Sequence, residues 1–116
     1  MKEKRKFVRL KTPIGISYSL VKKHKHPRRH LTFVNNIGGG GVSLIAKEDL
    51  RIGDLVKLEI QIPHLEETVD AVGEVIWFSF SRDTEHSARE AGIRFRDISA
   101  PDLNQVLEYV YTIGIG

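Results

Sequence analysis

Two arginines and a run of glycines are the residues whose types and spacing suggest chemistry in this 116-residue chain. Arg5 and Arg9 lie four residues apart in "RKFVR", and "NIGGGG" places Asn36 beside four glycines at positions 38–41. Guanidinium groups bind phosphate through paired hydrogen bonds, grip the N7/O6 edge of guanine and stack on purines. Glycines leave backbone N–H groups open to a ligand. A ligand that contains both phosphates and guanines would use all of these groups.

The glycine run has a commoner use as a hairpin loop, and this interpretation is favoured when the run is taken alone. The segment "VSLIA" follows the glycines and continues as a strand, so the pattern is not the G-x-G-x-x-G loop that opens a helix. The chain also lacks G-x-x-x-x-G-K-[ST]. These features argue against Rossmann and P-loop nucleotide sites, and a ligand at the glycines needs charge from elsewhere in the chain.

Net positive charge is confined to two short segments. Residues 1–11 contain six basic side chains and one acidic one, and residues 22–30 contain five basic side chains and no acidic one. The whole chain has a net charge of only +3, so the remainder is acidic. This asymmetry predicts an anionic partner at the two basic segments, whereas a solvated tail is the simpler interpretation of the first segment alone.

Catalytic and metal sites find little support in the sequence. Three of the five histidines, His24, His26 and His30, lie in the second basic segment, where neighbouring cations oppose a metal. The chain has no cysteine and no G-x-S-x-G motif, which leaves nucleophilic catalysis without its usual groups. It also lacks both an apolar signal segment and a run of about 18 apolar residues. We therefore expect a cytoplasmic protein that is not an enzyme, carries no cofactor or metal and does not insert into a membrane.

Alternation of apolar and polar residues predicts six strands, followed by one helix. In the strand over 69–78, Trp77 shares its parity with Val75, and Gly73 suggests a bulge or bend. The polar segment 79–87 is predicted to be an exposed loop, and Ser99 to cap the terminal helix. Short strands with one helix favour an all-β barrel with a helical cap. The strand segments are 14–20, 30–36, 42–46, 55–62, 69–78 and 89–98.

Trp77 and Phe78 are adjacent on one strand, so one of them is expected in the core and the other at the surface. An exposed aromatic residue in a basic chain suggests a single-stranded nucleic-acid-binding barrel. Such surfaces present several aromatic residues on neighbouring strands, and no alternation of that kind is visible here. We keep this interpretation as the less favoured alternative.

Taken together, the two motifs resemble the signature of the PilZ domain family, bacterial receptors for the second messenger cyclic di-GMP. The family pattern is R-x-x-x-R near the N-terminus, often after another Arg, followed by [DN]-x-S-x-x-G. Here Lys4 stands where the leading Arg often lies, Arg5 and Arg9 match the first motif, and Gly38 replaces the usual Ser of the second. The segments "VGEVIW" and "AGIRFRDIS" resemble later strands of the family.

The resemblance implies a six-stranded antiparallel PilZ-type β-barrel with a C-terminal α-helix, made of a basic arm over 1–12, the barrel over 13–98 and the helix over 99–113. Arg5 and Arg9 would hold guanine and phosphate, Asn36 would reach a guanine or order the loop, and Gly41 would keep the wall clear. The full set of residues implied to bind cyclic di-GMP is Lys4, Arg5, Arg9, Asn36, Gly38 and Gly41.

The resemblance further implies a receptor whose arm changes conformation on binding cyclic di-GMP and which signals through an unidentified protein partner. DNA or RNA is not expected as a partner. Some family members have lost the signature and act only in protein–protein interactions. Because Gly38 departs from the pattern, a protein-interaction module without nucleotide binding stays as the alternative function.

Overall fold

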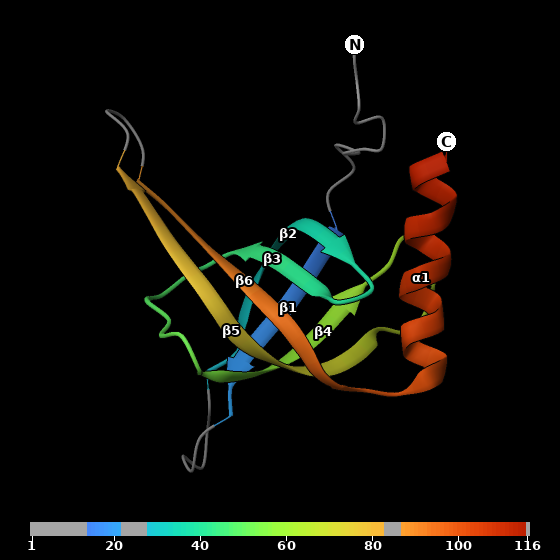
Figure 1. Ribbon diagram of the computed structural model, residues 1–116, viewed down its shortest axis with the longest axis horizontal. Helices are drawn as coiled ribbons and strands as arrows, with labels where there is room; N and C mark the ends of the chain where they lie inside the picture. The colour runs from blue at the N-terminus through green and yellow to red at the C-terminus, as the bar shows by residue number, and fades with distance from the viewer. Residues whose placement is uncertain (1–13, 22–27, 83–86, 116) are drawn as a thin grey trace.

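Six antiparallel strands close into a barrel in the computed structural model of the chain, and one helix lies along its side (Figure 1). The structure describes residues 14–21, 28–82 and 87–115. The strand order is β1-β2-β3-β6-β5-β4, and pairing of β4 with β1 closes the barrel. The elements are β1 (Ile14–Leu20), β2 (His30–Gly38), β3 (Gly41–Ile45), β4 (Leu55–Gln61), β5 (Val69–Arg82), β6 (Ser87–Ile98) and α1 (Ala100–Ile115). The predicted six-stranded barrel with a terminal helix is therefore confirmed.

The core consists of the inward-facing residues of every strand. In β4, Val56, Leu58 and Ile60 are fully buried, and the residues between them point toward solvent, as period-two alternation predicts. Tyr18 is the largest side chain in this core; its hydroxyl accepts a hydrogen bond from the Lys47 N–H at 2.9 Å. Burial raises the pKa of Tyr18 above its usual value of 10, while the hydrogen bond from Lys47 acts in the opposite direction.

Helix α1 begins at the predicted cap. The Ser99 hydroxyl accepts a hydrogen bond from the Asp102 N–H at 3.2 Å. Among the apolar residues of the helix, Val106 is fully buried, whereas Leu107 and Tyr111 are exposed. The helix packs beside β2 and β5, with the β2–β3 turn next to it (Figure 1). No helix within the described residues is long and apolar enough to cross a membrane.

Two of the three register shifts in the barrel turn Asn36 and Trp77 outward. The β2–β3 pairing shifts between Val34 and Asn36, and the β5–β6 pairing shifts between Val75 and Trp77. Each shift inserts one residue and reverses the alternation beyond it. Of the adjacent pair expected to divide between core and surface, Trp77 therefore lies at the surface, 40% exposed, and Phe78 packs against the core.

The loop predicted over 79–87 is wrong for residues 79–82 and 87, which belong to strands, while residues 83–86 lie outside the described residues. Strand β5 continues to Arg82 and β6 begins at Ser87, so the β5–β6 hairpin projects beyond the barrel (Figure 1). The serines in this segment are typical of turns, yet Ser79 pairs with Glu90 within a continuous stretch of the β5–β6 ladder. The irregularity predicted at Gly73 is confirmed, because the β5–β6 register shifts between Val72 and Gly73. A Cβ added at Gly73 would lie 2.4 Å from Ile93 Cγ2.

Candidate functional site

The glycine run forms the tip of the β2–β3 hairpin, as predicted. Gly38 ends β2 and pairs with Gly41 at the start of β3, and Gly39 and Gly40 make the turn. None of the four has φ in the left-handed region, so turn geometry alone does not require glycine. A Cβ on Gly41 would lie 2.0 Å from the Ile93 carbonyl oxygen, whereas one on Gly38 or Gly40 would meet nothing within 4 Å. Close strand packing therefore requires glycine at position 41 but not at 38 or 40.

Four strands bring outward-facing residues into two neighbouring rows. Strand pairing aligns β2 with β3, β3 with β6 and β6 with β5, so one residue from each strand contributes to each row. The first row is Asn36, Ser43, Gly92 and Trp77. The second row is Gly38, Gly41, Arg94 and Glu74. Three of these eight residues are glycines: Gly38 and Gly41 leave the β2–β3 side of the surface without side chains, and Gly92 lies under the Trp77 side chain.

All of these residues except Glu74 line an open groove of about 640 Å³ on the outside of the barrel, here called the outer groove. Its volume is within the range of small-ligand sites, which is about 300 to 1,000 Å³. Asn36, Gly38, Gly41 and Ser43 contribute to its lining from the β2–β3 side, and Trp77, Gly92 and Arg94 from the β5–β6 side. The groove can hold a flat ligand directly against the backbone.

An aromatic ring and a guanidinium group flank the outer groove. A Cβ on Gly92 would lie 2.1 Å from Trp77 Nε1, so the indole rests on this glycine and remains 40% exposed. Arg94 is exposed and makes no ion pair with any described residue, whereas its neighbour Arg96 is paired with Glu74. An indole face and an unengaged guanidinium suit a base and a phosphate, respectively.

The structure brings three of the six sequence-predicted ligand residues together. Asn36, Gly38 and Gly41 lie on the same side of the outer groove. The other three, Lys4, Arg5 and Arg9, lie outside the described residues. Ser43, Gly92 and Arg94 were not predicted as site residues, and Trp77 was considered only in the less favoured nucleic-acid interpretation. Their proximity to the glycines depends on β3 pairing with β6.

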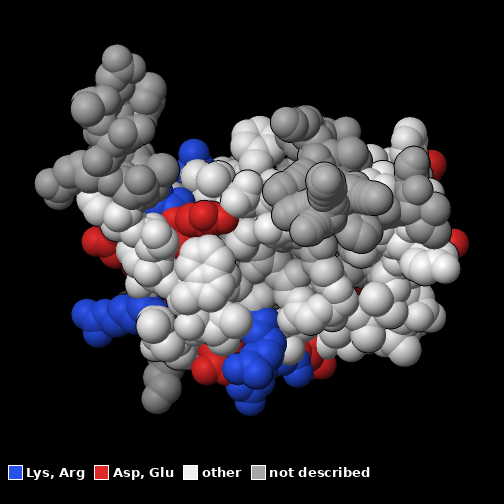
Figure 2. Space-filling view, turned by 45° about the horizontal axis from the view of Figure 1, so that its top comes forward, with Lys and Arg blue, Asp and Glu red and all other residues white. Residues whose placement is uncertain are grey.

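Charged side chains are unevenly distributed over the molecule. Figure 2 shows a face on which uncharged side chains predominate, with the described basic and acidic side chains mostly near its periphery. Arg29, from the second basic segment, forms an ion pair with Glu59 at 2.7 Å. His30 contacts Glu48 at 3.1 Å and stacks on Tyr18. Within the described residues, an anionic ligand would therefore depend on individual cations rather than on a broad basic field.

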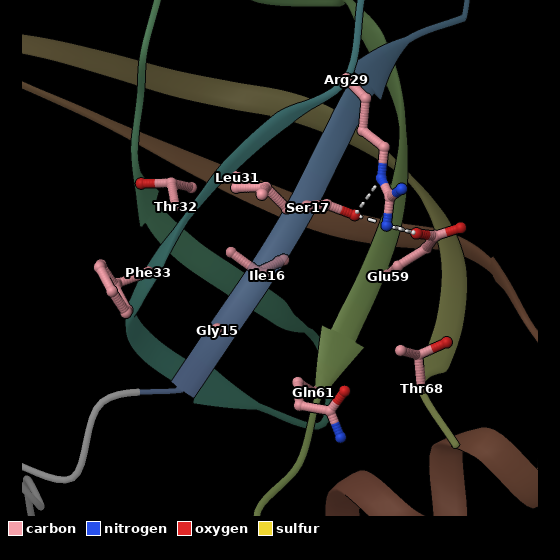
Figure 3. A pocket seen from close by; sticks show the side chains of 10 residues that line it. All are labelled: Gly15, Ile16, Ser17, Arg29, Leu31, Thr32, Phe33, Glu59, Gln61 and Thr68. Carbon is pink, nitrogen blue, oxygen red and sulfur yellow. Dashed lines mark hydrogen bonds and ion pairs between the residues drawn. The ribbon is translucent and has the colours of Figure 1, made fainter. Parts of the chain in front are cut away.

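A second groove, here called the β1 groove, lies on the outer face of β1, β2 and β4 and has a volume of about 400 Å³ (Figure 3). Arg29 Nη2 and the buried Ser17 hydroxyl both donate hydrogen bonds to Glu59 Oε1, at 2.7 and 3.0 Å. These polar groups satisfy one another. Leu31 and Phe33, in contrast, are 71% and 58% exposed along its wall. The β1 groove therefore offers apolar contact rather than an anion site.

No group of three or more metal-ligating side chains occurs in the part of the chain that the structure describes.

Comparison with curated proteins finds no match. Solved structures match over nearly the whole chain. Bacillus subtilis MotI/DgrA, an inhibitor of motility, has 19% identity and a TM-score of 0.68 over 96% of this chain and 51% of its own. MrkH from K. pneumonia has 15% identity and a TM-score of 0.74 over 97% of this chain and 50% of its own.

The PilZ domain of YcgR from Escherichia coli, solved with c-di-GMP, has 14% identity and a TM-score of 0.66 over 96% of this chain and 92% of its own. At these identities the structural likeness concerns the fold. The chain spans about half the length of the MotI and MrkH structures. The PilZ domain family model, however, matches the sequence itself over residues 3–112. The chain therefore belongs to the PilZ domain family.

Proposed function

We propose that this chain is a cyclic di-GMP receptor domain in which the arm over residues 1–12 folds over a nucleotide seated in the outer groove. The observation that carries the proposal is the glycine-floored surface between Asn36, the Trp77 indole and the Arg94 guanidinium. Family membership supports it, and so does the similarity to the YcgR domain that was solved with c-di-GMP.

The arm is attached close enough to reach the outer groove. Ile14, the first residue of β1, pairs with Val34, which precedes Asn36 by two positions on β2, or about 7 Å. Arg9 lies five positions before Ile14, and an extended chain of that length spans about 17 Å. Arg5 is four positions further away. Both guanidinium groups can therefore meet phosphate and guanine over the groove, with Lys4 as an additional positive charge.

The chemistry proposed for this site is binding without catalysis. The groove lining within the described residues contains no histidine, carboxylate or cysteine to act as a base or nucleophile. Cyclic di-GMP would be bound and released intact, and the rearranged arm would be read by a protein partner. Formation of linear dinucleotide at a rate proportional to protein concentration would contradict this.

Calorimetric titration of the full chain tests nucleotide binding and base preference together. A site that reads guanine prefers cyclic di-GMP to cyclic di-AMP at equal ligand charge. Arg9→Ala is expected to weaken binding by about 1.5 to 3 kcal/mol, or roughly 10-fold to 150-fold. Arg9→Lys should recover part of this loss, because it keeps the charge without the planar fork.

Arg29→Ala is the matched control, because Arg29 is paired with Glu59 in the β1 groove rather than in the outer groove. It should leave nucleotide affinity unchanged. Equal binding of cyclic di-AMP, or parental affinity in Arg9→Ala, would refute the receptor proposal. Slower amide exchange of residues 3–10 with saturating cyclic di-GMP would support arm closure, and unchanged exchange would oppose it.

A protein-interaction module without nucleotide binding is the second candidate. The exposed Leu31 and Phe33 favour it, because large apolar side chains grouped at a surface often mark protein contacts. If the parent chain shows no heat of binding with cyclic di-GMP at high micromolar concentration, this function becomes the better one.

A further inference from the structure

Ser43 is a buried polar residue with an unusual environment. It lies between the core residues Val42 and Leu44 on β3, so its side chain points to the outside of the barrel, yet it is only 7% exposed. The other two buried polar side chains have partners: Ser17 donates to Glu59, and Thr32 donates to the Ile45 carbonyl at 2.8 Å. The Ser43 hydroxyl has no hydrogen-bond partner among the described residues.

The position of Ser43 connects this hydroxyl with the outer groove. Ser43 lines the groove and pairs with Asn36 on one side and with Gly92, which carries the Trp77 indole, on the other. Gly38 pairs with Gly41, two residues before Ser43, so positions 38 and 43 are diagonal neighbours. Side chains in that relation are about 7 to 8 Å apart and can contact the same ligand.

A hydroxyl that is buried without a partner is unfavourable for folding, and such groups call for a specific explanation. A serine hydroxyl donates one hydrogen bond and accepts up to two. Phosphate oxygens and the guanine N7/O6 edge are suitable acceptors for its proton. A nucleotide in the outer groove would therefore supply the partner that the described residues do not.

We propose that Ser43 donates a hydrogen bond to cyclic di-GMP and so supplies the hydroxyl that this chain lacks at position 38. This inference rests on the receptor function proposed above. It explains both the glycine at position 38, where the family pattern has serine, and the unpartnered hydroxyl beside it. Ser43 then acts as a ligand-binding residue rather than as part of the core.

Affinity and stability should change in opposite directions in Ser43→Ala. Loss of one hydrogen bond to the ligand should weaken cyclic di-GMP binding about 2-fold to 13-fold. Removal of a buried, unpartnered hydroxyl should leave the Tm of the free protein unchanged or higher. Ser43→Cys, nearly equal in size but a weak donor, should behave like Ser43→Ala. Ser19→Ala, on β1 and outside the outer groove, is the control and should bind like the parent.

The double variant Ser43→Ala/Gly38→Ser tests the substitution of one hydroxyl for the other. If the two hydroxyls serve the same ligand, Gly38→Ser should restore affinity to within about 2-fold of the parent, giving a clear coupling in the double-mutant cycle. Parental affinity in Ser43→Ala would overturn this inference but not the receptor function. Weaker binding accompanied by a lower Tm would also overturn it, because that result would assign Ser43 to packing. A parent that binds no cyclic di-GMP would overturn the receptor function, and this inference with it.

Discussion

The structure assigns different physical roles to glycines that are consecutive in the sequence, and Gly41→Ala tests this directly. The added Cβ would lie 2.0 Å from the Ile93 carbonyl oxygen and 2.9 Å from Arg94 Cα. Both are backbone atoms of β6, so relief requires β3 and β6 to separate by about 1 Å. Overpacking of this kind costs about 1 to 3 kcal/mol. For a domain near 100 residues, each kcal/mol lowers Tm by about 4 to 8 °C.

Gly40→Ala is the matched control for Gly41→Ala. Its Cβ would meet nothing within 4 Å, and its φ is outside the left-handed region. Reduced entropy of the unfolded chain should therefore stabilise this variant by about 0.4 to 1 kcal/mol. Thermal melts and urea titrations of the two variants and the parent give the comparison. If Gly41→Ala is as stable as Gly40→Ala, the close approach of β3 to β6 is not what requires glycine at position 41.

Three further variants test other parts of the reasoning. Gly92→Ala should displace the indole that rests on it, and because Trp77 is the only tryptophan, its fluorescence should shift to longer wavelength; an unchanged spectrum would oppose that packing. Gly38→Ser should tighten cyclic di-GMP binding up to about 10-fold in calorimetry, with a larger gain when Ser43 is alanine; weaker binding would contradict it. Burial raises the pKa of Tyr18, so the free energy of unfolding should fall as pH rises above about 10, and Tyr18→Phe should reduce this slope in melts across pH.

Local pattern predicted most strands because each of them has one buried face. The alternation of Val56, Leu58 and Ile60 with polar residues survives unchanged in the barrel, and the cap at Ser99 forms as its sequence predicts. Such features depend on neighbours along the chain. The hairpin at the glycines belongs to the same class, since a short, flexible segment between two strands rarely does anything else.

Whether a side chain faces the core or solvent is harder to predict for residues that follow a register shift. Counting by twos from Thr32 and Val34 puts Asn36 inside the barrel, yet the shift before Asn36 turns it outward and puts Ile37 against the core. Trp77 reaches the surface in the same way. Each shift is fixed by pairing with another strand, so composition within the strand carries no signal for it.

The candidate site was predictable only in the part that lies on one hairpin. Asn36, Gly38 and Gly41 are close in sequence and belong to a motif, whereas Trp77 and Arg94 come from strands far along the chain. They join the groove because β3 pairs with β6 rather than with β4, the strand that follows it in the sequence. One local signal existed: a tryptophan and a glycine in adjacent strands can pair so that the ring lies on the backbone, as Trp77 does on Gly92.

The glycines at positions 38 and 40 have no structural need that would explain them. Neither has left-handed φ, and neither lies near an atom that a Cβ would meet. Glycine in a strand is less favourable than alanine by roughly 0.5 to 1 kcal/mol, so the fold is destabilised by their presence. Gly41, in contrast, is required by the packing of β3 against β6. The free protein gains nothing from an open surface at Gly40, which supports the proposed nucleotide lying on the backbone there, whereas at position 38 the proposed site accommodates the serine of Gly38→Ser.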